Sequence, residues 1–160
     1  MIPRPIRRNI VSCIRLRDVG YPEQLYEIRS SQLMKQVIIL NGPAGVGKTT
    51  VGKLLAQESE NSVCISGDAL KEFIVNRKTD TVQGRLGYKN GAMLIQNFLK
   101  AGYELVIFEY VFPSRKQIDY FMGELKVDVP VFLYTLWASL ETVQRREAGR
   151  SERASLGDRV

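Results

Sequence analysis

Apolar residues along the chain gather in short, nearly unbroken runs, which alternate with stretches where apolar residues recur at helical spacing. The runs are typical of buried strands and lie at Val37–Leu40, Ser62–Ser66, Glu104–Phe108 and Val129–Leu136. The periodic stretches predict helices after Thr50, over Leu70–Asn76, Ala92–Lys100 and Arg115–Leu125, and from Ser139 onward. This alternation favours an α/β fold, in which helices wrap a parallel sheet.

The predicted strands end next to polar residues that can carry chemistry. Asn41–Thr50 follows the first strand, Asp68 follows the second, and Glu109 follows the third. Because crossovers in a parallel sheet are right-handed, the carboxyl ends of its strands form one edge, where ligands bind. We therefore expect these three features to meet at that edge.

The segment after the first strand reads Asn-Gly-Pro-Ala-Gly-Val-Gly-Lys-Thr-Thr, with the Gly-x4-Gly-Lys-Thr spacing of a phosphate-binding loop. Its glycines let the backbone bend tightly, so that N–H groups and the following helix N-terminus can bind anionic oxygens. We expect an exposed Lys48 ammonium to reach the β- and γ-phosphates of a nucleotide, and the Thr49 hydroxyl to ligate Mg²⁺. The predicted nucleotide-binding residues are Gly42, Pro43, Ala44, Gly45, Val46, Gly47, Lys48, Thr49 and Thr50.

Two carboxylates complete the predicted site. Asp68 can face the terminal phosphate, where it accepts the proton of a substrate hydroxyl or holds Mg²⁺ through water. Alternatively, Asp68 only caps the helix that follows it. Glu109 has the position that orients magnesium-bound water, or it is an exposed charge at a strand end. Thr49, Asp68 and Glu109 are therefore the candidate metal ligands.

Arginines concentrate between positions 145 and 153, with four in nine residues. Guanidinium groups suit the negative charge that spreads over a phosphoryl group during its transfer. Arg150 and Arg153 are the favoured candidates, because Gly149 provides a hinge just before them. The alternative is a solvated, salt-bridged helix, since glutamates are interleaved with the arginines.

Composition limits the classes of protein that remain. With 44% hydrophobic and 25% charged residues, and no apolar stretch near the ~18 residues that span a membrane, we expect a globular protein without a membrane partner. The two cysteines fit a reducing, cytoplasmic compartment. The net charge is +6, but the sequence has no basic stripe interleaved with aromatic residues. We therefore do not expect nucleic acid as the main substrate. Because the chain has no histidine, a general base must be Asp, Glu, Lys or an activated water. The oligomeric state stays open.

Residues 1–33 differ in composition from the rest of the chain. They hold six Arg, no Lys and three prolines, whereas Met34 opens a strand that feeds directly into the loop. Three alternatives remain open: upstream sequence translated from a wrongly chosen start, an arm that packs on the domain, or an Arg-rich targeting segment. We divide the chain into an N-terminal extension, residues 1–33, and a phosphate-loop domain, residues 34–160. We expect nucleotide binding not to require the extension.

The loop, Gly67-Asp68, Glu109 and the arginine stretch together resemble the small phosphate-loop kinases, a group that includes gluconate kinase, shikimate kinase and chloramphenicol phosphotransferase. Leu133–Val160 is similar to the strand, helix and arginine lid of the gluconate-kinase-like members. The resemblance implies a three-layer P-loop NTPase fold with a parallel sheet, ATP with Mg²⁺ as donor, and a hydroxyl of a small molecule as acceptor. The catalytic residues that it implies are Lys48, Asp68, Arg150 and Arg153.

Two departures from that family matter. Only one carboxylate, Asp68, follows the second strand, where shikimate kinases carry an Asp-x-Asp pair. The chain also ends at Val160, so we expect a sheet that is C-terminally truncated relative to the family, with a strand near Asn9–Leu16 as the alternative replacement. The leading hypothesis is an ATP-dependent kinase of a small molecule, with a sugar acid as one candidate acceptor. The alternatives are a nucleotide-binding protein without efficient transfer, and a kinase of nucleic acid ends or sugar-nucleotides.

Overall fold

A parallel sheet of five strands, in the order β1-β5-β2-β4-β3, organises the chain. The structure is a computed structural model and describes residues 14–15, 35–75 and 82–148. The strands are β1 (Ile14–Arg15), β2 (Gln36–Asn41), β3 (Ser62–Ser66), β4 (Leu105–Glu109) and β5 (Val131–Trp137). The helices are α1 (Lys48–Gln57), α2 (Ala69–Glu72), α3 (Val82–Lys100), α4 (Arg115–Glu124) and α5 (Leu140–Ala148). No helix within these ranges is long and apolar enough to cross a membrane.

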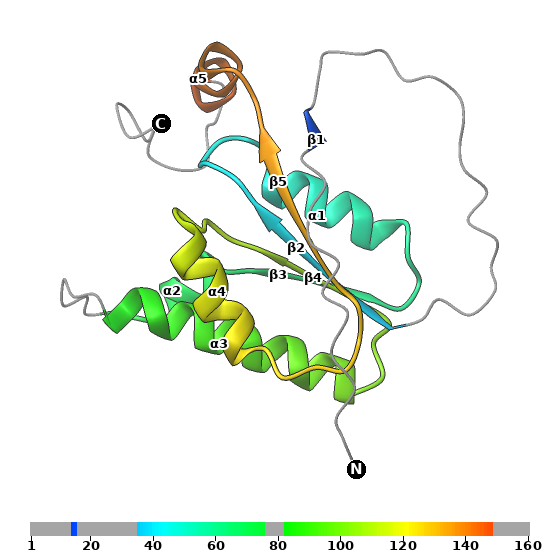
Figure 1. Ribbon diagram of the computed structural model, residues 1–160. Coiled ribbons are helices and arrows are strands. Elements are labelled where there is room, and N and C mark those ends of the chain that lie inside the picture. Colours follow the sequence, from blue (N-terminus) through cyan, green and yellow to red (C-terminus); the bar gives the residue numbers. More distant parts are fainter. Residues whose placement is uncertain (1–13, 16–34, 76–81, 149–160) are drawn as a thin grey trace.

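Helices lie on both faces of the sheet and produce three layers (Figure 1). α3 and α4 pack against each other on one face, and α1 lies on the opposite face. The larger core cluster lies under α3 and α4 and includes Phe108 and Phe121, whose stacked rings have centroids 5.1 Å apart. The smaller cluster lies under α1, around Leu40 and Ile107. Both faces of β2 and β4 are thus covered, which explains their nearly continuous apolar runs.

The four strands predicted from the apolar runs are present, with boundaries shifted by two residues at most. The helix predicted over Leu70–Asn76 is shorter and ends at Glu72. The helix predicted over Ala92–Lys100 begins ten residues earlier, at Val82. The parallel α/β sheet is therefore confirmed, whereas the extents of these two helices were predicted wrongly.

The first half of α3 was not predicted from the sequence because it contains glycines, and glycine in a helix costs about 1 kcal/mol relative to alanine. Packing explains why they are there. A Cβ on Gly91 would lie 2.5 Å from Cζ of Phe108, and a Cβ on Gly87 would lie 3.1 Å from the hydroxyl oxygen of Tyr110. The helix therefore gives up propensity so that two aromatic rings can approach its backbone.

β1 is the part of residues 1–33 that the structure describes. It pairs in parallel with the end of β5, at Leu136 and Trp137. Ile14–Arg15 falls inside the stretch where the sequence offers a replacement strand, so this alternative gains a structural observation. The rest of residues 1–33 lies outside the described part, and the domain boundary at Met34 stays a prediction.

Candidate functional site

The phosphate-binding loop joins β2 to α1 at the carboxyl edge of the sheet. Gly42 and Gly47 have φ angles of 143° and 103°, which residues with a Cβ rarely adopt. At Gly42 a Cβ would also lie 2.5 Å from the carbonyl oxygen of Leu136 in β5. Val46 is 1% exposed and anchors the loop in the interior. The shape of the loop thus depends on glycine at both positions and on its contact with β5.

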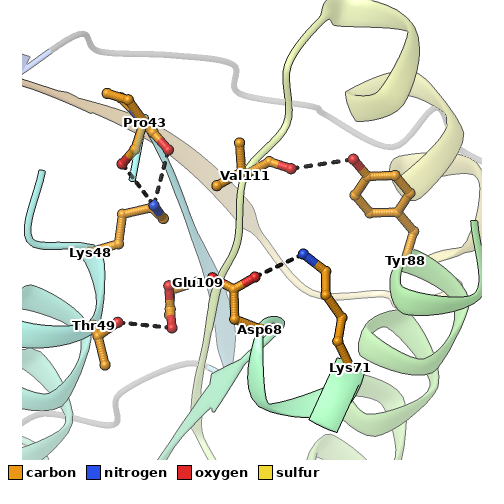
Figure 2. Close-up of polar contacts among 9 residues, drawn as sticks. Pro43, Lys48, Thr49, Asp68, Lys71, Tyr88, Glu109 and Val111 are labelled. Carbon is orange, nitrogen blue, oxygen red and sulfur yellow. Dashed lines mark hydrogen bonds and ion pairs between the residues drawn. The ribbon is translucent and has the colours of Figure 1, made fainter. Parts of the chain in front are cut away.

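Lys48 begins α1 and folds back over the loop. Its Nζ donates hydrogen bonds to the carbonyl oxygens of Gly42 and Pro43, both at 3.0 Å (Figure 2). The residue is only 6% exposed. The expectation of an exposed ammonium is therefore wrong, because the carbonyls of the loop enclose it. Their bonds hold a positive charge inside the cradle, where a phosphate group would bind.

Thr49 and Glu109 are in direct contact at the same edge. The Thr49 hydroxyl donates to Oε1 of Glu109 at 3.1 Å (Figure 2). Glu109 ends β4 and is only 2% exposed, so the alternative of an exposed strand-end charge is wrong. A hydroxyl and a carboxylate oxygen are hard ligands of the kind that Mg²⁺ prefers.

Asn41, the last residue of β2, joins the neighbouring elements beneath the loop. Its Nδ2 donates to Oγ1 of Thr135 in β5 at 3.3 Å, and its Oδ1 accepts the N–H of Phe112 at 2.9 Å. The residue is 8% exposed, so these bonds satisfy a buried amide. Sequence reasoning missed this role. The signal that could have revealed it is a polar residue at the end of an otherwise apolar strand.

Asp68 lies one residue after Gly67, at the carboxyl end of β3. Its Oδ1 accepts a hydrogen bond from Nζ of Lys71 at 2.8 Å (Figure 2), and its side chain makes no capping bond to α2. Asp68 does occupy the N-cap position of α2, where its carbonyl oxygen accepts the N–H of Lys71 at 3.0 Å, but its carboxylate is not the capping group. Burial acts to lower the pKa of Lys71, but the hydrogen bonds with Asp68 and Tyr110 outweigh burial and raise that pKa above 10.5. Lys71 is thus a cation at neutral pH and holds one oxygen of the Asp68 carboxylate.

Two aromatic rings, those of Tyr110 and Tyr88, pack next to the residues that position the Asp68 carboxylate. Tyr110 is 3% exposed, and Nζ of Lys71 lies 4.6 Å from the centroid of its ring. A Cβ on Gly67 would lie 2.3 Å from Cδ2 of Tyr110. The ring of Tyr88 packs edge-on against Tyr110, with centroids 5.2 Å apart. The position of Asp68 therefore depends on how Tyr110 packs against Gly67.

An arginine of α5 also contacts the phosphate-binding loop. Nη1 of Arg146 donates to the carbonyl oxygen of Val46 at 3.2 Å. Arg150 and Arg153, which the sequence favours, lie outside the described residues, so their roles stay predictions. The sequence shows helical spacing for Arg146, Arg150 and Arg153 alike, and the hinge argument from Gly149 favoured the last two over Arg146.

The donor set fits a magnesium ion that is shared with a nucleotide. Within the described ranges, no group of three or more His, Cys, Asp or Glu side chains could hold a metal ion by itself. Mg²⁺ is commonly bound by one or two protein oxygens together with phosphate oxygens and water. Thr49 and Glu109 are in contact, whereas Asp68 is held by Lys71. The first two are therefore the better candidates of the three.

The profile of the AAA domain family matches residues 37–159, which include the loop and every described site residue. Among curated protein sequences, none matches this chain significantly. Solved structures share its fold. The crystal structure of APE1195 matches with a TM-score of 0.57 and 21% identity, over 74% of this chain and 69% of that chain.

Kinases are among the solved structures with this fold. An unliganded sugar kinase from Janibacter sp. HTCC2649 matches with a TM-score of 0.56 and 20% identity, over 75% of this chain and 69% of that chain. The Mycobacterium tuberculosis APS kinase CysC, in complex with AMPPNP and APS, matches with a TM-score of 0.56 and 14% identity, over 72% of this chain and 70% of that chain. A chain in the Pnkp1/Rnl/Hen1 RNA repair complex matches with a TM-score of 0.63 and 16% identity, over 79% of this chain but only 40% of that chain. These identities show a shared fold and nothing finer. Because the family profile covers well over half of the sequence, the chain belongs to the AAA domain family and has the P-loop fold of small kinases.

Proposed function

We propose that the protein is an ATP-dependent kinase that transfers the terminal phosphoryl group of ATP to a hydroxyl group of a small molecule. One observation carries the proposal: a glycine-shaped phosphate loop, the Thr49–Glu109 pair and the Asp68 carboxylate all lie at one edge of the sheet (Figure 2). The fold likeness to a sugar kinase, and to an APS kinase in complex with AMPPNP, supports phosphoryl transfer as the class of reaction.

The nucleotide half of the proposed site consists of the loop and the residues at its ends. Backbone N–H groups of residues 44–50 and the Lys48 ammonium would bind the β- and γ-phosphates. Thr49 would hold Mg²⁺, and Glu109, which accepts a hydrogen bond from the Thr49 hydroxyl, would orient that hydroxyl and hold metal-bound water. Mg²⁺, when bound, supplies positive charge that neutralises the phosphate oxygens. Arg146 adds positive charge at the loop, in the role proposed for Arg150 and Arg153.

The acceptor half centres on Asp68. Lys71 holds Oδ1, which leaves the second carboxylate oxygen to receive a proton. In the proposed reaction, the acceptor hydroxyl gives its proton to Asp68 while its oxygen bonds to the terminal phosphorus. The bond from that phosphorus to the β–γ bridging oxygen breaks, and ADP leaves. The acceptor would dock near α2 and the start of α3, and a sugar acid is one candidate.

A panel of acceptors tests this proposal. Sugars, sugar acids and nucleosides would each be mixed with Mg-ATP, and ADP release would be measured against a sample without acceptor. We expect one chemical class to stimulate release, and Asp68→Asn to lower that turnover by ~10²-fold with little change in nucleotide affinity, because Asn cannot take the proton. Glu72→Gln, which changes an exposed carboxylate in α2, the short helix that follows Asp68, is the matched control. Asp68→Asn turnover equal to that of the control would refute the base assignment.

The end of a nucleic acid chain, or a sugar-nucleotide, is the second candidate acceptor. The fold likeness to a chain of an RNA repair complex favours the end of a nucleic acid. Adding a 5′-hydroxyl oligonucleotide and a sugar-nucleotide to the panel separates the two candidates. Binding of the oligonucleotide that weakens steeply with salt, together with ADP release, would select the nucleic acid. Only trace hydrolysis across the whole panel would instead favour a nucleotide-binding protein without efficient transfer.

A further inference from the structure

Asn41 is a buried polar residue that the proposed reaction does not use. It ends β2, and the phosphate loop begins at the next residue, Gly42. Among the residues that the structure describes, the buried polar or charged side chains are those of Asn41, Lys48 and Glu109. The other two already belong to the nucleotide half of the proposed site. Asn41 lies where any shift of its backbone would move the start of the loop.

The side chain of Asn41 connects the chain on both sides of β2 at the point where the sheet ends. Pairing of β2 with β4 ends at Leu40 and Glu109, and pairing of β2 with β5 ends at Asn41 and Thr135. Next to these positions, Oδ1 of Asn41 accepts the N–H of Phe112 at 2.9 Å, and Nδ2 donates to Oγ1 of Thr135 at 3.3 Å. One amide thus links the start of the loop to the segment after β4 and to β5.

The chemistry of the two partners fixes the orientation of this amide. The backbone N–H of Phe112 can only donate, so the amide oxygen must face it and the NH₂ group must face Thr135. An apolar residue at position 41 would remove both bonds. An aspartate could keep both, with the Thr135 hydroxyl as donor, but it would place a negative charge next to the start of the phosphate loop. Asparagine is therefore suited to this position because it makes both bonds without a charge.

Both partners of the amide are held by packing that does not involve Asn41. Phe112 is buried, its ring stacks on that of Tyr88 with centroids 5.1 Å apart, and it packs edge-on against Phe121 with centroids 5.2 Å apart. Thr135 lies within β5, which pairs with β2 over five residues. The amide is therefore anchored to the core on one side and to the sheet on the other.

The anchored residue is joined directly to the part of the loop that holds Lys48. The carbonyl oxygen of Gly42, the next residue, accepts a hydrogen bond from Nζ of Lys48 at 3.0 Å. The carbonyl oxygen of Pro43 accepts a second one at 3.0 Å. Loss of the amide bonds would release the start of the loop, and with it the two carbonyls that orient the ammonium.

We propose that Asn41 is a positioning residue for the phosphate loop. Its amide fixes where the loop starts, and the loop and Lys48 then bind phosphate groups more tightly than a loop with a free start would. Thr135 acts in turn through Asn41. This inference rests on the nucleotide-binding part of the proposed function, and it requires neither the transfer step nor an identified acceptor.

Calorimetric titration of the full chain with Mg²⁺ and a non-hydrolysable ATP analogue tests this role. Asn41→Ala should weaken binding by ~10-fold or more, because both bonds are lost. Thr135→Val, which removes only the hydroxyl, should weaken it by about 3-fold, whereas Thr135→Ser, which keeps the hydroxyl, should bind like the wild type. Asn41→Ala combined with Thr135→Val should bind no more weakly than Asn41→Ala alone. The control is Ile95→Val in the core under α3 and α4, which should lower the unfolding midpoint and leave the affinity unchanged.

The outcomes separate positioning from a contribution to stability alone. If Asn41→Ala lowers the unfolding midpoint but the folded protein binds the analogue like the wild type, the proposal is overturned. Hydrogen exchange of the unliganded chain is the second measurement: amides of residues 42–51 should exchange faster in Asn41→Ala than in Ile95→Val, and equal exchange there also overturns it. If Asn41→Ala does not fold, Thr135→Val and Thr135→Ser replace it in both measurements. A wild type that does not bind the analogue would refute the proposed function, while hydrogen exchange would still test the role of Asn41.

Discussion

Removing the Lys48 side chain should cost the protein both stability and nucleotide binding. Lys48→Ala deletes three buried methylene groups at about 0.8 kcal/mol each. It also leaves the carbonyl oxygens of Gly42 and Pro43 without an ammonium donor, at about 1–3 kcal/mol for the buried one. The restored side-chain entropy and the released charge offset part of this cost. We expect a net loss of about 2–4 kcal/mol, which for a chain of this size lowers the unfolding midpoint by about 5–15 °C.

Lys48→Met separates the two effects, because methionine keeps most of the apolar stem. Its midpoint should fall between those of Lys48→Ala and the wild type. Both variants should bind Mg-ATP at least ~10-fold more weakly, since a hydrogen bond to a charged group contributes about 1.5–3 kcal/mol. Circular dichroism melts measure the first quantity, and calorimetric titration with a non-hydrolysable ATP analogue measures the second. A Lys48→Ala midpoint within 1 °C of the wild type would refute the burial of this side chain, and unchanged nucleotide affinity would refute the loop assignment.

Three further outcomes follow from other contacts. Gly91→Ala should lower the free energy of unfolding by about 1–2 kcal/mol in denaturant melts, because its Cβ would lie 2.5 Å from Cζ of Phe108, and this clash outweighs the gain in helix propensity. Gly123→Ala in α4, where a Cβ meets nothing within 4 Å, should instead be neutral or stabilising by about 0.5 kcal/mol; equal effects of the two would contradict the packing argument. Burial and a neighbouring carboxylate raise the pKa of Cys64 above 9.0, so its alkylation, followed by peptide mass spectrometry, should reach half its maximal rate above that pH. Replacing Arg146 by Met should weaken binding of the ATP analogue by ~10-fold, and affinity equal to that of the wild type would remove this residue from the site.

Much of the fold could be read from the sequence because the strands of a covered parallel sheet are nearly continuous apolar runs. The start of α3 could not be read, since the reasons for Gly87 and Gly91 lie in β4 and the segment after it, far along the chain. Local propensity counts a helical glycine only as a cost. The ring that occupies the space of the missing Cβ becomes visible only in three dimensions.

The site was predictable to a similar degree. The loop spacing and the acids after the strands placed Thr49, Asp68 and Glu109 at one edge, because strand order and direction follow from the alternation of strands and helices. The burial of Lys48 and the partner of Asp68 were not predictable. Both depend on where side-chain atoms lie to within a few ångströms. In addition, Lys71 lies on a one-turn helix that was predicted to be longer than it is.

The consecutive residues Glu109 and Tyr110 connect the two halves of the proposed site. Because alternate residues of an extended chain point to opposite faces, Glu109 contacts Thr49 on the α1 side, while Tyr110 packs beneath Lys71 on the other. The backbone fixes both, since the carbonyl of Glu109 accepts the N–H of Gly67 at 2.8 Å and the N–H of Tyr110 donates to the carbonyl of Leu40 at 3.0 Å. The distance between the phosphate loop and Asp68 is therefore set by the register of β4, not by flexible side chains. A different acceptor could then be accommodated by changes in α2 and α3 without moving the phosphate half of the site.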